Sequence, residues 1–177
     1  MQASIDERMQ AMLDRSEMRD VLARYARGID RGDAELLKSC YHADAIEEHA
    51  GNYEGNAHEY IDQAIPRVMQ MGAMQHLLGS SHFDISGDTA YVETNVWTFV
   101  RFKDDDGNEV DTFTGGRLVD RFEKREGTWK IAHRWTVLDW NRDTPTAEGW
   151  CLGLFDFTQK GARVGIKGKD DPSYERF

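Results

Sequence analysis

The chain has 177 residues, of which 40 % are hydrophobic and 11 % aromatic, and its formal net charge is −10 with a pI near 5.0. This composition is typical of a globular domain and not of a disordered chain. A chain this acidic lacks the basic surface that nucleic acid or an anionic membrane requires, which argues against both as partners.

The first third of the chain has a helical pattern. From Ser16 onward, apolar side chains recur three or four positions apart, at Met18, Val21, Leu22, Tyr25, Ala26 and Ile29. This stripe predicts an amphipathic helix that ends at Gly32, and Asp33 is a suitable N-cap for a second, short helix. The segment 45–55 predicts a pair of short strands, and residues 56–71 return to helical spacing. Pro66 lies inside that helix and predicts a kink or a break there.

After residue 75 the period changes to two. The ranges 75–85, 90–102, 110–124 and 129–140 alternate apolar and polar residues and are joined by turns rich in Gly and Asp. Strands this long must twist and coil, so they predict a strongly curved antiparallel sheet. The fold class is therefore α+β: a cone-shaped sheet covered by the N-terminal helices, with one pocket between them. We expect one domain over residues 1–140 and an arm over 141–177 that packs on this domain or on a neighbouring subunit.

Asp30 is an unusual residue for its place in the chain. It falls in the last turn of the first predicted helix, where a negative charge opposes the helix dipole at a cost of about 0.3–1 kcal/mol. On a helical wheel it lies about 105° from the centre of the apolar stripe, at an edge from which it can reach the sheet. The predicted strand at 75–85 begins close to His76, so the two side chains could meet at the mouth of the cone.

An Asp–His pair suits a general base. The carboxylate fixes the imidazole tautomer and stabilises the imidazolium that forms when the ring takes a proton. Such a base can remove a proton next to a carbonyl or β to a leaving group, and Tyr25 could donate a hydrogen bond to the oxygen where charge develops. Each residue also has a structural interpretation: Asp30 as a turn residue, His76 as a satisfied structural histidine and Tyr25 as a core aromatic.

Other residues are candidates for the walls of the pocket. Residues of one parity on a strand share a face, which makes Trp97, Phe99, Phe113 and Trp135 candidates for the concave wall. They would suit a ring-bearing or steroid-like substrate, with core packing as the alternative. His133 and Arg134 alternate, so only one of them faces the pocket. Arg134 could bind a polar substrate group there, or pair with an acid on the outer face.

Two further features predict no special chemistry. His42, Glu47, Glu48 and His49 lie close together, but their spacing fits no standard zinc site, so we expect no metal. Cys40 and Cys151 match no metal or redox motif and are interpreted as reduced packing residues. The N-terminus has charges where a signal peptide needs an apolar run, which indicates a cytoplasmic protein.

The candidate residues and their surroundings resemble a known family. The runs "YARGIDRGDAELLKSCYHADA", "YEG", "QHLLGSS" and "GGRLVDRFEKREGTWKIAHR" are similar, in this order, to the SnoaL-like branch of the nuclear transport factor 2-like superfamily. The resemblance covers residues 10 to 140 and implies the same α+β cone. Among its members, this chain resembles scytalone dehydratase, bile acid 7α-dehydratase and hexachlorocyclohexane dehydrochlorinase. It departs from the first of these, whose second catalytic histidine has no clear counterpart near Trp97.

The resemblance implies an activity as well as a fold. Those enzymes carry out eliminations with an Asp–His dyad placed as Asp30 and His76 are here, with no metal or organic cofactor, and Tyr25 matches a pocket tyrosine. The leading hypothesis is a dehydratase-type lyase acting on a small cyclic or polycyclic molecule. An isomerase or cyclase using the same proton abstraction is the alternative, as is a non-catalytic binding or assembly module. Apolar residues on the outer face of the sheet also predict a homo-oligomer, dimer or trimer.

Overall fold

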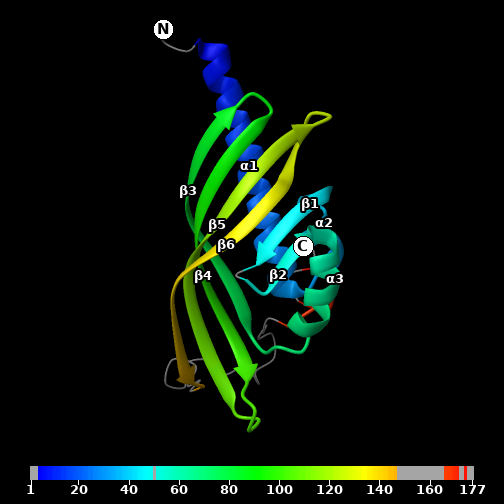
Figure 1. Cartoon of the computed structure of the whole chain (residues 1–177), viewed down its shortest axis with the longest axis vertical. Helices are drawn as coiled ribbons and strands as arrows, with labels where there is room; N and C mark the ends of the chain where they lie inside the picture. The colour runs from blue at the N-terminus through cyan, green and yellow to red at the C-terminus, as the bar shows by residue number, and fades with distance from the viewer. Residues whose placement is uncertain (1–3, 50, 147–165, 172–173, 175–177) are drawn as a thin grey trace.

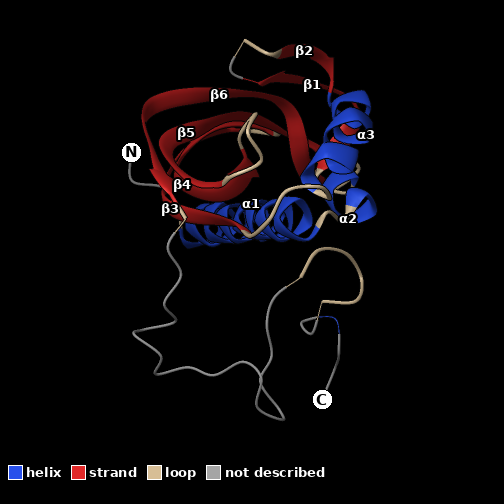
Figure 2. Ribbon diagram, turned by 90° about the horizontal axis from the view of Figure 1, so that it is seen from below, coloured by secondary structure: helices blue, strands red, loops and turns tan. Residues whose placement is uncertain are grey.

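A long helix lies across the open side of a curved six-stranded sheet (Figures 1 and 2). The computed structural model describes residues 4–49, 51–146, 166–171 and 174. The helices are α1 (Ile5–Arg31), α2 (Ala34–Lys38) and α3 (Ala57–Val68). The strands are β1 (Tyr41–His49), β2 (Tyr53–Asn56), β3 (Met74–Ser86), β4 (Thr89–Lys103), β5 (Glu109–Arg125) and β6 (Thr128–Pro145).

The sheet has the order β2-β1-β6-β5-β4-β3, and β3 to β6 form an antiparallel meander. The predicted α+β class, a curved sheet covered by N-terminal helices, is confirmed. One junction differs from the prediction, because β1 runs parallel to β6. These two strands are far apart in the sequence, with β2, α3 and strands β3 to β5 between them, so no hairpin forces them to be antiparallel. Figure 2 shows the sheet curling from β3 round to β6, with α3 beside its β1–β2 end.

Helix α1 is longer than the apolar stripe predicted. It begins at Ile5, where Ser4 and Glu7 form a capping box: the Glu7 amide donates to Ser4 Oγ and the Ser4 amide donates to the Glu7 carboxylate. It ends at Gly32, which has φ 66° in the left-handed region that favours glycine. The amide of Asp33 then donates to the Gly28 carbonyl at 2.8 Å, and Asp33 caps α2 as predicted. These bonds fix the helix end that holds Asp30.

Helix α3 is continuous through Pro66, so of the two predicted alternatives, a kink or a break, the break is wrong. Pro66 lies two residues before Val68, the last residue of the helix. In that last turn proline removes one backbone donor without interrupting a longer run of hydrogen bonds. Asn56 starts the helix by accepting bonds from the amides of His58 and Glu59 at 2.9 and 3.2 Å.

The core lies between the inner side of α1 and the concave face of the sheet. Met18, Val21, Leu22, Tyr25 and Ile29 of the predicted stripe are all buried. They pack against buried residues of the sheet and of the other helices, including Val92, Leu118, Phe122, Trp129, Ile131, Leu37 and Ile61. Cys40 is a free thiol in this core, and Cys151 lies outside the described residues.

The segment expected to form the C-terminal arm begins inside strand β6. Strand β6 continues to Pro145, past the domain boundary expected at residue 140. Residues 147–165 of the expected arm lie outside the described residues. The described residues 166–171 and 174 contact the C-terminal end of α1 and the start of α2 in the same chain.

Candidate active site

Asp30 and His76 are hydrogen-bonded to each other. His76 Nδ1 lies 2.7 Å from Asp30 Oδ1, and the backbone amide of His76 donates to both carboxylate oxygens at 3.1 and 3.0 Å. The two side chains are only 13 % and 11 % exposed. The carboxylate therefore holds the first residues of β3 against the end of α1 and orients the imidazole ring. With Nδ1–H directed at Asp30, the neutral ring presents the lone pair of Nε2, the arrangement that a general base needs.

A cation offsets the unfavourable position of Asp30 at the C-terminal end of α1. Lys167 Nζ donates to the backbone carbonyl of Asp30 at 3.2 Å. Burial lowers the pKa of Lys167 to about 8, and the neighbouring Arg31 adds to this effect while Asp30 opposes it. The amide of Gly168 also donates to the Arg31 carbonyl at 2.6 Å. Positive charge and donors at a helix C-terminus interact favourably with its dipole, so the segment around Lys167 stabilises the helix end that carries the dyad.

Tyr25 lies beside the histidine and is buried. The ring centroids of Tyr25 and His76 are 6.3 Å apart in an edge-to-face arrangement, and the guanidinium of Arg134 lies 4.0 Å from the Tyr25 ring centroid. Burial raises the pKa of Tyr25 to about 12, although the Arg134 charge opposes the shift. Tyr25 therefore keeps its proton at neutral pH and is a hydrogen-bond donor to an oxygen in the cavity.

Tyr25 and His76 line a cavity of about 660 Å³ between the helices and the concave face. Its floor is apolar and includes Ile29, Leu37, Ile61, Val68, Val96, Val100 and Leu118. Its polar groups are mostly hydroxyls and imidazoles, from Tyr25, Tyr41, Tyr53, Tyr60, His49, His76, Thr98, Thr114 and Thr136. Among the described residues, the buried Oγ1 of Thr136 has no hydrogen-bond partner. An apolar cavity with a few convergent polar groups is the usual form of a small-molecule site.

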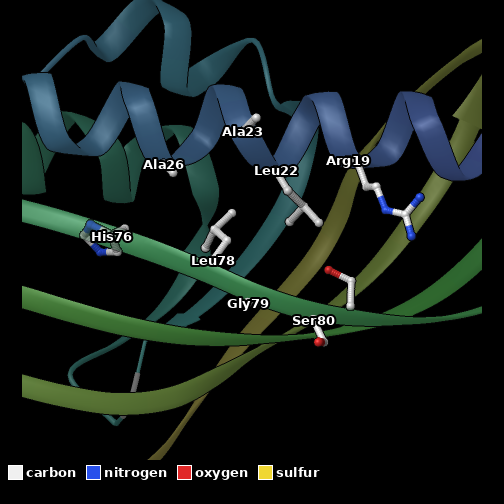
Figure 3. A pocket seen from close by; sticks show the side chains of 9 residues that line it. Arg19, Leu22, Ala23, Ala26, His76, Leu78, Gly79 and Ser80 are labelled. Atoms are coloured by element: carbon white, nitrogen blue, oxygen red, sulfur yellow. The ribbon is translucent and has the colours of Figure 1, made fainter.

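His76 also borders a second, more open cavity of about 480 Å³ between α1 and β3. Figure 3 shows it, with Arg19 and Leu22 of α1 on one side and Leu78 and Gly79 of β3 on the other. The larger cavity is the better candidate for substrate binding, because the buried Tyr25 and the other tyrosines face it.

The predicted aromatic wall is wrong. Trp97 and Phe113 are 61 % and 42 % exposed, and the inner face of β4 carries Val96, Thr98 and Val100 instead. Phe99 contacts Phe113 on the outer face, and Trp135 contacts His133 there. The four aromatics therefore lie on the convex side of the sheet.

A bulge in β3 decides which residue of β4 lies beside His76. Near the turn the pairs run in regular register, as in Ser86↔Thr89 and Ser81↔Thr94, and this register would pair His76 with Phe99. The two residues between Leu78 and Ser81 oppose a single residue of β4, so the register shifts by one and His76 pairs with Thr98. A shift of one residue moves a side chain to the opposite face. The alternation of residues along β3 could not by itself reveal this shift.

Arg134 faces the interior, as the alternation allowed, but it lies behind the cavity wall. It is 0 % exposed and donates to both oxygens of Asp120 at 2.6 and 2.7 Å and to the Tyr41 hydroxyl at 3.3 Å. Burial opposes its charge, yet the Asp120 carboxylate holds the pKa of Arg134 well above its usual range. Arg134 therefore contacts Tyr25 and Tyr41 from behind the cavity wall. It does not line the cavity, where the predicted contact with a substrate would be made.

The sequence interpretation missed a second polar group in the cavity. Glu47 and His49 were dismissed together with the metal motif, but two residues apart on a strand they share a face. Glu47 is 1 % exposed, and its carboxylate lies 3.2 Å from His49 Nδ1. A charged residue at an inward strand position was the available signal, since buried carboxylates are rare unless they are paired.

In the described part of the chain, no three His, Cys, Asp or Glu residues are grouped so as to hold a metal ion. No described helix is long and apolar enough to cross a bilayer.

Comparison with known proteins agrees with this architecture. The family model of the SnoaL-like domain matches residues 10–135. A putative scytalone dehydratase from Novosphingobium aromaticivorans superposes with a TM-score of 0.67 at 16 % identity, covering 77 % of this chain and 91 % of that one. Hexachlorocyclohexane dehydrochlorinase LinA-type3 from Novosphingobium barchaimii gives a TM-score of 0.65 at 17 % identity, covering 78 % and 94 %. None of the curated proteins matches the sequence.

Proposed function

The chain belongs to the SnoaL-like domain family, and from this membership and the geometry of its cavity we propose that it is a cofactor-independent lyase of the dehydratase type. The observation that carries the proposal is the bond between His76 and Asp30 at the edge of a largely apolar cavity. The solved structures with this fold include a putative dehydratase and a dehydrochlorinase, both named for eliminations.

The proposed mechanism begins with proton removal from carbon. Nε2 of His76 takes a proton from the carbon next to a carbonyl, and Asp30 stabilises the imidazolium that forms. Tyr25 donates a hydrogen bond to the carbonyl oxygen as negative charge develops on it. The electron pair of the broken C–H bond then forms a carbon–carbon double bond while the group on the β carbon leaves. Since Tyr25 keeps its proton, it can stay a donor throughout the reaction.

The cavity indicates the class of substrate. A volume of about 660 Å³ with an apolar floor fits a cyclic or polycyclic molecule with few polar groups. Its carbonyl would lie near Tyr25 and His76, and the unpartnered Thr136 Oγ1 offers a bond to another oxygen. We therefore propose cyclic β-hydroxy ketones as the substrate class.

The proposal is tested by incubating the protein with a panel of cyclic β-hydroxy ketones. Formation of the conjugated enone is followed by ultraviolet absorbance, and loss of one water is followed by mass spectrometry. Lyase activity predicts both signals. A product of unchanged mass would identify isomerisation by the same base, and saturable binding of panel members without any product would favour a binding module.

Tyr25→Phe is expected to lower kcat by about 10²–10³-fold with a smaller change in KM, because the lost hydroxyl serves mainly the developing oxyanion. The phenyl ring preserves the packing against Arg134, so the variant is expected to fold. Steady-state kinetics on an active panel ketone measures both constants. A kcat within 3-fold of wild type would remove Tyr25 from the mechanism.

We propose that the protein is a dimer or trimer. Leu77, Trp97, Phe113 and Trp140 are exposed on the convex face, where neighbouring strands place them close together. An exposed apolar patch of this kind is usually covered by a partner. Light scattering at micromolar concentration is expected to give two or three times the chain mass of 20.3 kDa, and Trp97→Arg is expected to dissociate the assembly. A wild-type monomer would contradict this proposal.

A further inference from the structure

A second histidine of the same cavity is bonded to a carboxylate. His49 lies at the end of β1, and its Nδ1 is 3.2 Å from Oε1 of Glu47. Its ring stacks on Tyr60 of α3, with centroids 4.9 Å apart and planes at 27°. The carboxylate and the stacking together fix the ring, and Nε2 is the nitrogen left for a ligand. Like the Asp30–His76 pair, this is an imidazole held by a carboxylate at the wall of the cavity.

Glu47 belongs to a buried chain of polar groups. Its Oε2 accepts from the Tyr41 hydroxyl at 3.0 Å, and the same hydroxyl accepts from Arg134, which pairs with Asp120. Two carboxylates therefore face one guanidinium in this network, and one net negative charge remains. The His49 ring borders this negative charge through its bond to Glu47. The His49 ring and Tyr41 both line the cavity, and of these two the imidazole is the group that can take up and release a proton near neutral pH.

The surroundings of the two histidines differ in the sign of the nearby charge. Behind Asp30 lies the ammonium of Lys167, which partly balances the carboxylate bonded to His76. The carboxylate bonded to His49 has no such cation of its own, because the guanidinium behind it is paired with Asp120. Two similar groups in one site take opposite roles when their environments differ in this way. Hence His76 is suited to accept a proton and His49 is suited to give one.

We propose that His49 is the general acid of the reaction, which protonates the leaving oxygen of a β-hydroxyl group. The inference rests on the proposed lyase function and specifies its substrate, since only a poor leaving group needs an acid. Glu47 is its positioning residue, because it touches the ring and not the substrate.

The atoms of the step balance. His76 gains the proton from the α carbon, and the C–H electron pair becomes the new double bond. The C–O bond on the β carbon breaks with its electrons going to oxygen, and His49 gives that oxygen its proton, so that water leaves. Afterwards His76 carries one extra proton and His49 lacks one. Exchange with solvent restores both, and no co-reactant is required.

The test compares two substrates that differ only in the leaving group: a cyclic β-hydroxy ketone and its β-chloro analogue, whose chloride leaves without a proton. For His49→Gln we expect kcat/KM to fall 10²-fold or more with the hydroxy ketone and less than 3-fold with the chloro ketone. Glu47→Gln should show the same selectivity with a smaller loss. His82→Gln, an exposed histidine on the outer face of β3, is the matched control and should change neither rate by more than 2-fold. Thermal melting shows whether each variant is folded.

Each result has one meaning. Equal losses with both substrates in folded His49→Gln and Glu47→Gln would overturn the role of His49 and leave the lyase intact. Rates close to wild type with both substrates would overturn it as well. If wild-type protein converts neither ketone, the proposed function fails, and the role of His49 fails with it. The selective loss with the hydroxy ketone alone supports the acid.

Discussion

His76→Ala is expected to lower kcat/KM for elimination by about 10³-fold or more. A positioned general base contributes about 10²–10⁴-fold to the rate. Among the described residues, His76 is the imidazole bonded to Asp30, so no other oriented ring is left to replace it. The substitution leaves the backbone amide of residue 76 bonded to Asp30, so the joint between β3 and α1 is expected to survive. Steady-state kinetics, with the circular dichroism spectrum as a check on folding, measures the loss.

Asp30→Asn provides the sharper version of this test. The amide oxygen can still accept the backbone bond from His76, but its NH₂ group then faces Nδ1 and can only donate to it. The ring must adopt the other tautomer, with the proton on Nε2, and it can no longer act as a base. We expect a loss of about 10³–10⁴-fold with little change in stability. Wild-type turnover in either folded variant would show that the pair is structural.

Arg134→Met is expected to reduce the free energy of unfolding by about 3–5 kcal/mol. Both side chains of the Arg134–Asp120 pair are completely buried, and the substitution leaves the carboxylate of Asp120 without its charge partner. The Tyr41 hydroxyl and the face of the Tyr25 ring also lose their contact with the guanidinium. Urea unfolding followed by tryptophan fluorescence measures the change.

The double variant Arg134→Met, Asp120→Leu is the control for this prediction. It removes both charges and fills the space with apolar atoms, a change that is often close to neutral for a buried ion pair. We expect it to recover a large part of the loss. A single variant that loses less than about 1 kcal/mol, or a double variant less stable than the single one, would contradict the role assigned to the pair.

The elements of the fold could be predicted from local sequence patterns. The apolar stripe from Met18 to Ile29, the glycine after it and the alternation beyond residue 75 each reflect the burial of one face, which depends on neighbours in sequence. The parallel pairing of β1 with β6 was not accessible, because it depends on where two distant strands meet. The break allowed for at Pro66 does not occur, since the effect of a proline depends on how close it lies to a helix end.

The site could be predicted from the sequence only in part. The position of Asp30 on the helical wheel placed it at the edge facing the sheet, and the structure brings it to His76. The wall opposite was assigned to the wrong face of β4, where Val96 and Val100 and not the aromatics point inward. The bulge at Gly79–Ser80, which makes Thr98 and not Phe99 the partner of His76, was not visible in the alternation of residues. The pair formed by Glu47 and His49 was overlooked because both were judged as metal ligands and not as residues on one inward face.

The unusual position of Asp30 has an explanation in the structure. The carboxylate bonds to the backbone and the ring of His76, and Lys167 compensates the helix end where it lies. Asp30 therefore both joins the start of β3 to the end of α1 and orients the imidazole of His76. The proposal that this imidazole takes a proton from carbon is the claim on which the account of function depends.

The most direct measurement of that claim uses a cyclic ketone that lacks a leaving group, so that proton removal is the only reaction available. Incubated in D₂O with the protein, the hydrogens next to the carbonyl are followed by proton NMR. The proposed mechanism predicts exchange faster than in buffer alone with wild-type protein and exchange at the buffer rate with His76→Ala. Exchange at the buffer rate with the wild-type protein and a ketone shown to bind in the cavity, or unchanged fast exchange in the variant, would contradict it.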